Sequence, residues 1–566
     1  MTTRIHHAGS EIAQRGTPLR PDQMAARMAR RGTWQVARWQ LLAMRSWTWS
    51  LIIESIGQPL LYMVAMGVGL GTLISANGRT VDGVSYLVFV APAIMVLTAT
   101  MSAATEFSYP VMRGFRWDRL YQGPAATPVT PAQIALGHHL AVMIRFLGQA
   151  VVFWLIMLAF GAAPGPWSWL CVPITMLSAS AFGALLQGYA AGLDSEGEEF
   201  TFVLRFVVMP LVLFSGTYFP LSSMPGYLQW IGWISPIWHG TQLAREVSYG
   251  AGEPGWLIGV HLVVLAGLSA AGDGLGMPQL HPEALAVTRA VNTQTQEIIR
   301  RLERRRPAPG LYSGNTTAVL ERGLRAIRSQ NWAVLVSGFF EPVLYLLAMG
   351  VGMGGLVGTV EGPGGHPISY AAYIAPALLA TSAMNGAIYD STWNVFFKLN
   401  FSKLYQAMLQ TSLGPLDVAI GEILLALLRG LLYALGFMAV LVTMGLVTSW
   451  WAVLMIPAAL LVALGFASFG MGITSFMKTF QQMDMINLVM LPMFLFSATL
   501  YPISVYPQPV QWIVQAMPLW HGVELMRQLS VGHLTAMTGA HALYFLVMSG
   551  LGLWLTAGRL RALFLR

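Results

Sequence analysis

Long apolar stretches separated by short polar, arginine-rich segments run along this chain. A bilayer core of ~30 Å needs about 20 apolar residues in a helix, and twelve stretches approach that length, six in each half of the chain. The pattern predicts an all-α polytopic membrane protein. The expected spans lie near residues 48–75, 85–108, 135–160, 165–192, 200–217, 254–271, 331–357, 369–391, 416–444, 449–476, 483–499 and 538–558.

The two sets of six spans repeat each other residue by residue. Gln58–Gly71 returns as Glu341–Gly354, and Leu213–Pro220 returns as Leu495–Pro502, and the offset between matched positions stays between 282 and 284. An even number of spans per copy makes the repeats parallel, and paired membrane repeats are typical of transporters. We therefore expect a tandem repeat of two six-helix bundles. Its parts are a first half over residues 1–271, a linker over 272–312 and a second half over 313–566.

Composition and charge support this interpretation. The chain is 55% hydrophobic and only 10% charged, whereas soluble proteins contain about 25% charged residues. The net charge of +8 comes from arginines in the N-terminal arm, the gap between the second and third spans, the linker and the C-terminal tail. With six spans per half, these segments share one side, which the positive-inside rule makes cytoplasmic, together with both termini. Cys171 is the only cysteine, so no intramolecular disulfide is possible.

The sequence contains no recognisable site for binding and hydrolysing ATP. Its three lysines, Lys398, Lys403 and Lys478, do not follow a glycine, so a Gly-Lys-Ser/Thr phosphate loop is missing. We expect no catalytic residue, no metal and no cofactor in this chain, which is therefore not predicted to be an enzyme.

Four charged residues fall inside predicted spans at matched positions. Glu106 corresponds to Asp390, and Arg145 corresponds to Arg429, both at an offset of 284. A charge at bilayer depth is costly and needs a partner or water. Since the second and third spans are joined by a short loop, we predict the pairs Glu106–Arg145 and Asp390–Arg429. They would either clamp two helices together or relay motion from the cytoplasmic loop to the transport path.

Two kinds of cytoplasmic segment mix aromatic and basic side chains. Residues 21–45 and 316–328 look like amphipathic helices on the membrane surface, serving as anchors or also touching a partner. The loops between the second and third spans suit docking into a groove on a partner protein, although interfacial anchoring explains them as well. Their candidate residues are Phe115, Arg116, Trp117, Asp118, Arg119, Tyr121, Phe397, Lys398, Phe401, Lys403 and Tyr405.

Proline- and tryptophan-rich stretches precede the sixth span of each half, over residues 217–254 and 499–537. They are too apolar for free loops and too broken for straight spans, so we predict short re-entrant or interfacial helices on the external side. Packing or capping at an outer gate explains their histidines better than metal binding, because no acidic or cysteine ligands cluster there. The candidate gate residues are Phe219, Pro220, Trp238, His239, Tyr501, Pro502, Trp520 and His521.

These features together resemble the membrane subunit of type-2 ABC exporters, such as the daunorubicin-resistance and nodulation lipooligosaccharide export permeases. The resemblance implies that Phe115–Tyr121 and Phe397–Tyr405 are coupling segments for separate ATP-binding subunits, which would hold ATP and Mg²⁺. It implies a bacterial plasma-membrane permease that exports a drug, a glycolipid or a lipid-linked molecule between its halves. Most such permeases are half-size dimers, so this fused chain would take two ATPase subunits, identical or different.

A proton-coupled secondary transporter is the main alternative function. It would use Glu54, Glu106, Glu341 or Asp390 as proton-coupled sites. The amphipathic surface helices and the broad external stretches have no ready place in that architecture. Transport that persists without ATP and stops when the proton gradient collapses would favour it.

Overall fold

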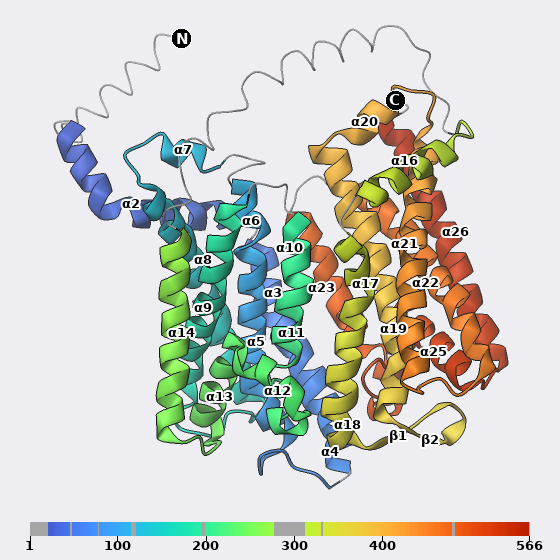
Figure 1. Ribbon diagram of the computed structural model, residues 1–566, viewed down its shortest axis with the longest axis horizontal. Helices are drawn as coiled ribbons and strands as arrows, with labels where there is room; N and C mark the ends of the chain where they lie inside the picture. The colour runs from blue at the N-terminus through green and yellow to red at the C-terminus, as the bar shows by residue number, and fades with distance from the viewer. Residues whose placement is uncertain are drawn as a thin grey trace.

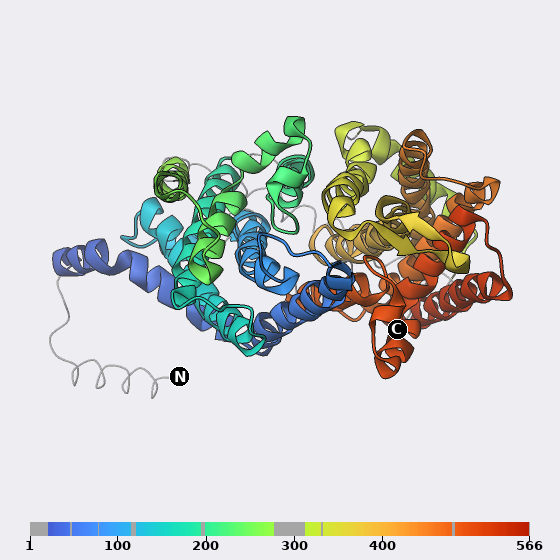
Figure 2. The ribbon, with the colours of Figure 1, turned by 90° about the horizontal axis from the view of Figure 1, so that it is seen from below.

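Two helical bundles stand side by side with their long helices roughly parallel (Figure 1). The computed structural model describes residues 21–45, 48–76, 78–114, 120–193, 198–276, 312–329, 332–477 and 481–564, so most of the predicted linker lies outside the described residues. Viewed along the helices, each bundle gathers its own spans, and the two bundles meet along a central boundary (Figure 2). The predicted all-α polytopic architecture is confirmed: ten of the described helices are long and apolar enough to cross a membrane.

The first half contains an amphipathic helix, helices at the six predicted spans, and short connecting helices; the helix at the fifth position is shorter and is not one of those ten. The amphipathic helix is α2 (Pro21–Met44). The spans are α3–η2–α4 (Thr48–Tyr62, Met63–Leu70, Gly71–Ala76), α5 with α6 (Tyr86–Glu106, Tyr109–Met112), α8 (Pro131–Ala159), η4 with α9 (Ser168–Leu170, Cys171–Gly192), α10–η5–α11 (Glu198–Val203, Leu204–Val208, Met209–Leu213) and α14 (Gly255–Gly276). The connecting helices are α7 (Gln122–Ala125), η6 (Leu221–Ser223), α12 (Gly226–Trp233) and α13 (Pro236–Tyr249).

The second half repeats this order. Its amphipathic helix is α16 (Thr316–Ser329). The spans are α17–η8–α18 (Trp332–Tyr345, Leu346–Met353, Gly354–Val357), α19 with η10 and η11 (Tyr370–Tyr389, Asp390–Asn394, Phe397–Phe401), α21 (Pro415–Thr443), η12 with α22 (Trp450–Leu454, Met455–Thr474), α23 (Gln481–Phe496) and α26 (Ala536–Phe564). The connecting helices are α20 (Leu404–Met408), η13 (Ile503–Val505), α24 (Gln508–Gln515) and α25 (Pro518–Val531).

The fifth span of each half ends three or four residues before the position that the sequence predicts. The helix stops at Leu213 in the first half and at Phe496 in the second, so each run is ~24 Å long at 1.5 Å per residue. The chain turns at Gly216 and Ala498, whose φ angles are +72° and +56°. A left-handed residue cannot continue a right-handed helix, and the backbone therefore leaves the helix before it reaches the length of the neighbouring spans.

A two-stranded β hairpin, which the all-α prediction did not include, follows the first span of the second half. Strand β1 (Thr359–Glu361) pairs antiparallel with β2 (Pro367–Ser369), and Val360 lies opposite Ile368. The first half has a single bridge, between Val81 and Val84, in the same place. The hairpin forms because glycines at 362, 364 and 365 allow a tight turn, in which Gly364 and Gly365 have positive φ angles.

Each amphipathic helix is held against the start of the third span of its own half. In the first half, Gln133 Nε2 donates to the carbonyl oxygen of Ala29 at 2.8 Å. In the second half, Asp417 accepts the backbone N–H groups of Ser313 at 2.7 Å and Asn315 at 2.9 Å. Both helices therefore lie at one end of the molecule, which we call the α2/α16 face. The end that carries α12, β1 and β2 is the hairpin face (Figure 1).

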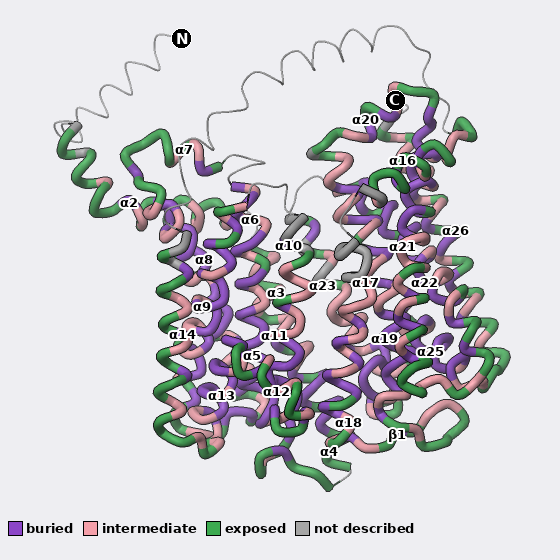
Figure 3. Tube along the Cα trace, viewed as in Figure 1, coloured by how far each residue is buried: buried purple, intermediate pink, exposed green. Residues whose placement is uncertain are grey.

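Side chains that point away from the bundles are exposed and largely apolar. On the outer helices α14 and α26, the outward side is exposed and the inward side is buried (Figure 3). The exposed residues there include Val263, Leu543 and Trp554. Apolar surface of this extent suits hydrocarbon, so these helices have the outer surface of a membrane protein.

The two halves exchange aromatic rings near the hairpin face. A Cβ atom on Gly69 of the first half would come within 2.5 Å of the Tyr501 ring of the second. A Cβ atom on the matched Gly352 would come within 2.6 Å of the Phe219 ring of the first half. Both rings are fully buried. The glycines of the π-helical segments η2 and η8 thus create the space into which the opposite half packs.

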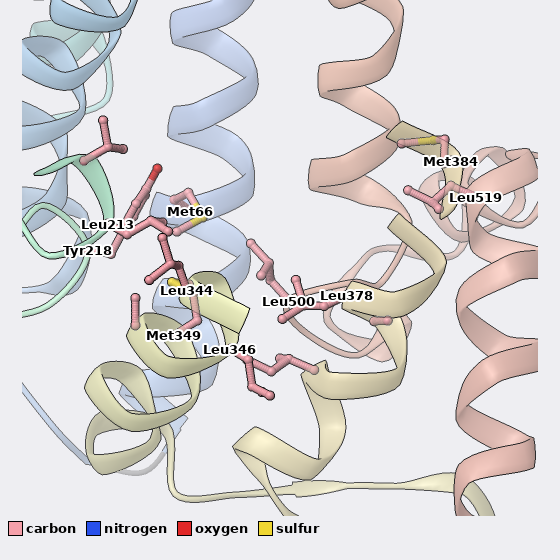
Figure 4. Packing of buried hydrophobic residues seen from close by; sticks show 14 of the residues in the cluster. Met66, Leu213, Tyr218, Leu344, Leu346, Met349, Leu378, Met384, Leu500 and Leu519 are labelled. Atoms are coloured by element: carbon pink, nitrogen blue, oxygen red, sulfur yellow. The ribbon is translucent and has the colours of Figure 1, made fainter. Parts of the chain in front are cut away.

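Apolar side chains from both halves fill the boundary beside these rings. Met66 and Leu213 of the first half lie close to Leu344 and Met349 of the second (Figure 4). All four belong to one continuous buried cluster that extends through both bundles. The halves therefore share a core, and separating them would expose apolar surface in proportion to the area buried.

We expect Gly352→Ala to destabilise the protein and Gly354→Ala to leave it unchanged or slightly more stable. The new methyl group at 352 would overlap the Phe219 ring, whereas a Cβ atom at 354 would meet no atom within 4 Å. Overpacking of this kind costs about 1–3 kcal/mol. Thermal unfolding of the detergent-purified variants measures the difference, and equal midpoints would contradict the ring exchange.

Candidate functional site

The four membrane-embedded charges form two ion pairs at matched places. Arg145 Nη1 on α8 lies 2.8 Å from Glu106 Oε1 at the end of α5. Arg429 Nη1 on α21 lies 3.1 Å from Asp390 Oδ1 at the start of η10. All four side chains are at most 20% exposed. Each pair fastens the second span of its half to the third, in the part of the span nearer the α2/α16 face.

The second coupling segment continues the second span without a break. Helical structure runs from Tyr370 to Phe401 through η10 and η11, and the chain then turns at Lys403, whose φ angle is +48°. Lys403 is exposed at this turn, while Phe397 is half-buried. A displacement of this turn would therefore act directly on the helix that carries Asp390.

Three of the proposed coupling residues lie inside the bundle and not on its surface. Lys398 Nζ lies 2.7 Å from Glu422 Oε2 on α21, and Tyr121 and Tyr405 are each only 5% exposed. In this conformation these side chains brace the segment from within, and the expectation that they face a partner stays a prediction. Phe115, Arg116, Trp117, Asp118 and Arg119 lie outside the described residues, as does the side chain of Phe401.

The two coupling segments are braced by different chemistry. Tyr121 lies with its hydroxyl 3.1 Å from Nδ1 of His138, and its ring packs on Gly114. In the second half, the residues at the matched positions, at an offset of 284, are Glu422 in place of His138 and Lys398 in place of Gly114. An ion pair in the second half therefore stands where the first half has a hydroxyl–imidazole contact and a glycine.

Two buried arginines, which the sequence analysis overlooked, hold the turns that end the fifth spans. The guanidinium of Arg245 on α13 donates to the carbonyl oxygens of Gly216 at 2.9 Å, Thr217 at 3.1 Å and Phe89 at 3.2 Å. Its Cζ atom lies 3.7 Å from the centre of the Phe89 ring. Backbone carbonyls that the turn removes from the helix thus find donors within the protein, as a membrane interior requires.

Arg527 on α25 does the same in the second half. It donates to the carbonyl oxygens of Ala498 at 2.8 Å and Tyr373 at 3.4 Å, and it lies 2.7 Å from Glu524 Oε1. Arg245 and Arg527 are separated by the same offset of 282 as the motifs around them. This repeated position was the feature of the sequence by which the two buried arginines could have been identified.

The remaining predicted gate residues lie beside these turns. Pro220 and Pro502 begin the short helices η6 and η13 directly after Phe219 and Tyr501. The Tyr501 hydroxyl lies 2.6 Å from that of Tyr506. These residues fix the direction in which each aromatic ring reaches the opposite half. A role as a moving gate stays a prediction, as does the re-entrant position of the helices that follow.

The predicted gate histidines each pair with a histidine of the sixth span. Nδ1 of His239 lies 2.7 Å from Nδ1 of His261, and Nδ1 of His521 lies 2.8 Å from Nδ1 of His541. Trp238 and Trp520 pack edge-on against both rings of their pairs. Burial, with the neighbouring His541, lowers the pKa of His521 to about 4. A contact between two ring nitrogens therefore ties each connecting helix to the sixth span.

Comparison with known proteins gives a consistent result. A family profile described as ABC-2 type transporter matches residues 33–249 and again residues 315–531, which confirms the tandem repeat. Nodulation protein J of Rhizobium leguminosarum bv. viciae is 32% identical over 228 residues, which are 40% of this chain and 85% of that protein. Nodulation protein J of Bradyrhizobium diazoefficiens is 32% identical over 215 residues, 38% of this chain and 80% of that protein. The probable multidrug ABC transporter permease YbhR of Escherichia coli is 28% identical over 167 residues, 29% of this chain and 44% of that protein.

We expect Arg245→Met to destabilise the protein by about 3 kcal/mol or more, because it leaves buried carbonyl groups without donors. Arg245→Lys should not restore stability, since one ammonium group cannot replace the planar guanidinium. Arg325→Met, on the exposed side of α16, is the control and should change stability little. Thermal unfolding in detergent compares the three, and an Arg245→Met protein as stable as the control would contradict the assignment.

A double-mutant cycle tests the ion pair of the first half. Glu106→Gln and Arg145→Gln should each cost about 3 kcal/mol, because each leaves one buried charge unpaired. The double variant should cost clearly less than the sum. Additive losses in the free energy of unfolding would show that the two charges do not stabilise each other.

Proposed function

Because the chain belongs to the ABC-2 type transporter family, we propose that it is the membrane-spanning permease of an ATP-driven exporter. The observation that carries this proposal is the double family match on two halves that exchange aromatic rings across one boundary. Two equivalent domains with a shared boundary can open and close a path between them. The chain itself is the transport component, and ATP hydrolysis belongs to a separate subunit.

We assign the α2/α16 face to the cytoplasm. The described arginines of α2, α16 and the end of α26 lie at that face, which the positive-inside rule would make cytoplasmic, and the amphipathic helices α2 and α16 would lie in the headgroup layer there. The hairpin face, with Phe219 and Tyr501 just inside it, would then be external. The proposed location is a bacterial inner membrane, with both termini inside the cell.

The proposed partners are two cytoplasmic ATP-binding subunits, which bring ATP and Mg²⁺. One would dock on the segment around Tyr121 and the other on the segment around Lys403. Because the two segments are braced differently, two non-identical subunits fit the chain as well as two copies of one. Closure of the subunits on ATP would displace the turn at Lys403, and the continuous helix from Tyr370 to Phe401 would carry that displacement toward the boundary between the halves.

The proposed substrate is a hydrophobic or amphipathic molecule, such as a drug, a glycolipid or a lipid-linked compound. The boundary is lined by side chains such as Met66, Leu213, Leu344 and Met349 (Figure 4), which offer apolar contact and no fixed charge. Similarity to nodulation protein J and to a multidrug permease supports this class, and the substrate would leave when Phe219 and Tyr501 withdraw from their glycines.

We expect Lys403→Glu to reduce stimulation of the partner's ATPase activity by about tenfold, because a reversed charge at a docking surface costs at least about 1.4 kcal/mol. Gln508→Glu places the same charge on the exposed hairpin face and is the matched control. ATP hydrolysis by the complex in proteoliposomes is the measurement, with membrane insertion checked for both variants.

Affinity purification of the full chain from membranes should also recover an ATP-binding subunit. Transport in proteoliposomes should require ATP and survive a protonophore. Transport at full rate by the isolated chain, stopped by the protonophore, would replace this proposal with a proton-coupled mechanism.

A further inference from the structure

Two seams join the halves, and the repeat relates one seam to the other. In the α11/α17 seam, α10, η5 and α11 of the first half contact α17 of the second half. In the α3/α23 seam, α23 of the second half contacts α3 of the first half. A fifth span meets a first span in both cases. Matched positions can therefore be compared directly, with an offset of 282 on the fifth spans and 283 on the first.

The α11/α17 seam is fastened by a ring pair and by charge. The rings of Phe206 and Phe340 lie 4.7 Å apart with an angle of 30° between their planes. The adjacent residues are Arg205 and Glu341, and the positive charge of Arg205 acts on the Glu341 carboxylate across the seam. Arg205 also makes a side-chain hydrogen bond with Tyr433 of the second half. One residue of the first half is thus anchored in the polar network of the other.

The matched positions of the α3/α23 seam carry neither the two rings nor the two charged residues. Gly57 stands at the position of Phe340 and Leu488 at that of Phe206, while Gln58 and Asn487 replace Glu341 and Arg205. A Cβ atom on Gly57 would meet no atom within 4 Å. The Oε1 atom of Gln58 is buried and accepts no hydrogen bond from any described residue. At these matched positions the seam therefore carries no charged residue, leaves space beside Gly57, and has one acceptor that no described residue uses.

Opening the two seams would have unequal costs. Parting the α11/α17 seam would bring two charges into hydrocarbon and separate a ring pair, whereas parting the α3/α23 seam would expose amides and aliphatic side chains. We propose that the α11/α17 seam stays closed through the transport cycle, and that the α3/α23 seam parts and admits an amphipathic lipid-like substrate from the bilayer. This proposal rests on the function proposed above and assigns the path by which its substrate arrives.

The position and chemistry of Gln58 define the substrate that would fit. Gln58 lies ten residues into α3, or about 15 Å from the end of that helix at the α2/α16 face, so it lies in the half of the first span nearer that face. A head group carrying a hydroxyl or amide N–H could donate to its free Oε1 atom. The acyl chains would remain beside Ile53 and Ile56, which are exposed on the outer side of α3.

Paired spin labels can follow both seams without touching the residues that fasten them. In a Cys171→Ser chain, the pair Leu60→Cys and Val489→Cys reports on the α3/α23 seam. The matched pair, Val343→Cys and Val207→Cys, reports on the α11/α17 seam. Distances are measured by pulsed electron paramagnetic resonance on the full chain with its ATPase subunits in lipid nanodiscs, with ADP or with a non-hydrolysable ATP analogue.

We expect the nucleotide to change the 60–489 distance by about one helical turn, ~5 Å, and to leave the 207–343 distance unchanged. Adding Phe340→Gly and Glu341→Gln, which copies the chemistry of the α3/α23 seam, should make the 207–343 distance respond as well. Equal changes in both seams, or a change confined to 207–343, would overturn the inference. If neither distance changes in a complex whose ATPase activity the chain stimulates, the inference is also overturned, but the proposed function stands. Absence of any stimulation would reject both.

Cross-linking the same cysteine pairs with a short bis-maleimide tests the substrate path. The probe is phosphatidylethanolamine carrying a nitrobenzoxadiazole label, followed in proteoliposomes. Linking residues 60 and 489 should reduce its ATP-dependent transport at least tenfold, while linking 207 and 343 should leave transport within twofold of the unlinked protein. The reverse pattern would overturn the assignment, and so would an unlinked protein that transports no labelled lipid under conditions of normal ATPase stimulation.

Discussion

The architecture depends on the need to satisfy polar groups inside the protein wherever water is absent. Each fifth span ends early, and the turn that follows releases backbone carbonyls within the bundle. Arg245 and Arg527 supply the donors for those carbonyls, and the burial of an arginine is tolerable only because several acceptors surround it. Once these turns are held, Phe219 and Tyr501 have a fixed direction, and the short helices that follow are placed against the sixth spans.

Those fixed turns make the two halves parts of one structure. Each turn sends an aromatic ring onto a glycine of the opposite half, and each glycine lies in a π-helical segment whose small residues let the ring approach. The second span links this contact to the other end of the molecule, because it extends as one helix to the turn at Lys403 and carries Asp390 on the way. In the second half, one continuous helical segment, from Tyr370 to Phe401, therefore connects the end near the aromatic contacts with the turn at Lys403.

The sequence predicted those features that depend on local composition or on the repeat. Hydropathy located the spans, and the matched positions of Glu106 and Asp390 with Arg145 and Arg429 indicated the pairs that the structure brings together. Hydropathy could not show that the fifth spans end early, since that depends on Arg245 reaching carbonyls 28 and 29 residues away. Aromatic and basic character suggested a surface for Tyr121, Tyr405 and Lys398, but burial depends on partners such as Glu422 that only the fold brings near. Arg245 and Arg527 were visible as a matched pair and were overlooked, because neither lies in a predicted span.

Because the halves are fused in one chain, matched positions can carry different residues, which a symmetric homodimer does not allow. In a homodimer, any residue introduced at one seam or one coupling segment must be accepted at the other, so a residue that suits only one side is excluded. Here Gly114 and Lys398 differ, as do His138 and Glu422, and the two seams differ in ring contacts and in charge. The differences occur where the halves meet each other and where partners would dock, while the residues that hold the fold, such as Arg245 and Arg527, are the same in both halves. These differences thus lie at the seams and the coupling segments, whereas the arginines that hold the turns are common to both halves.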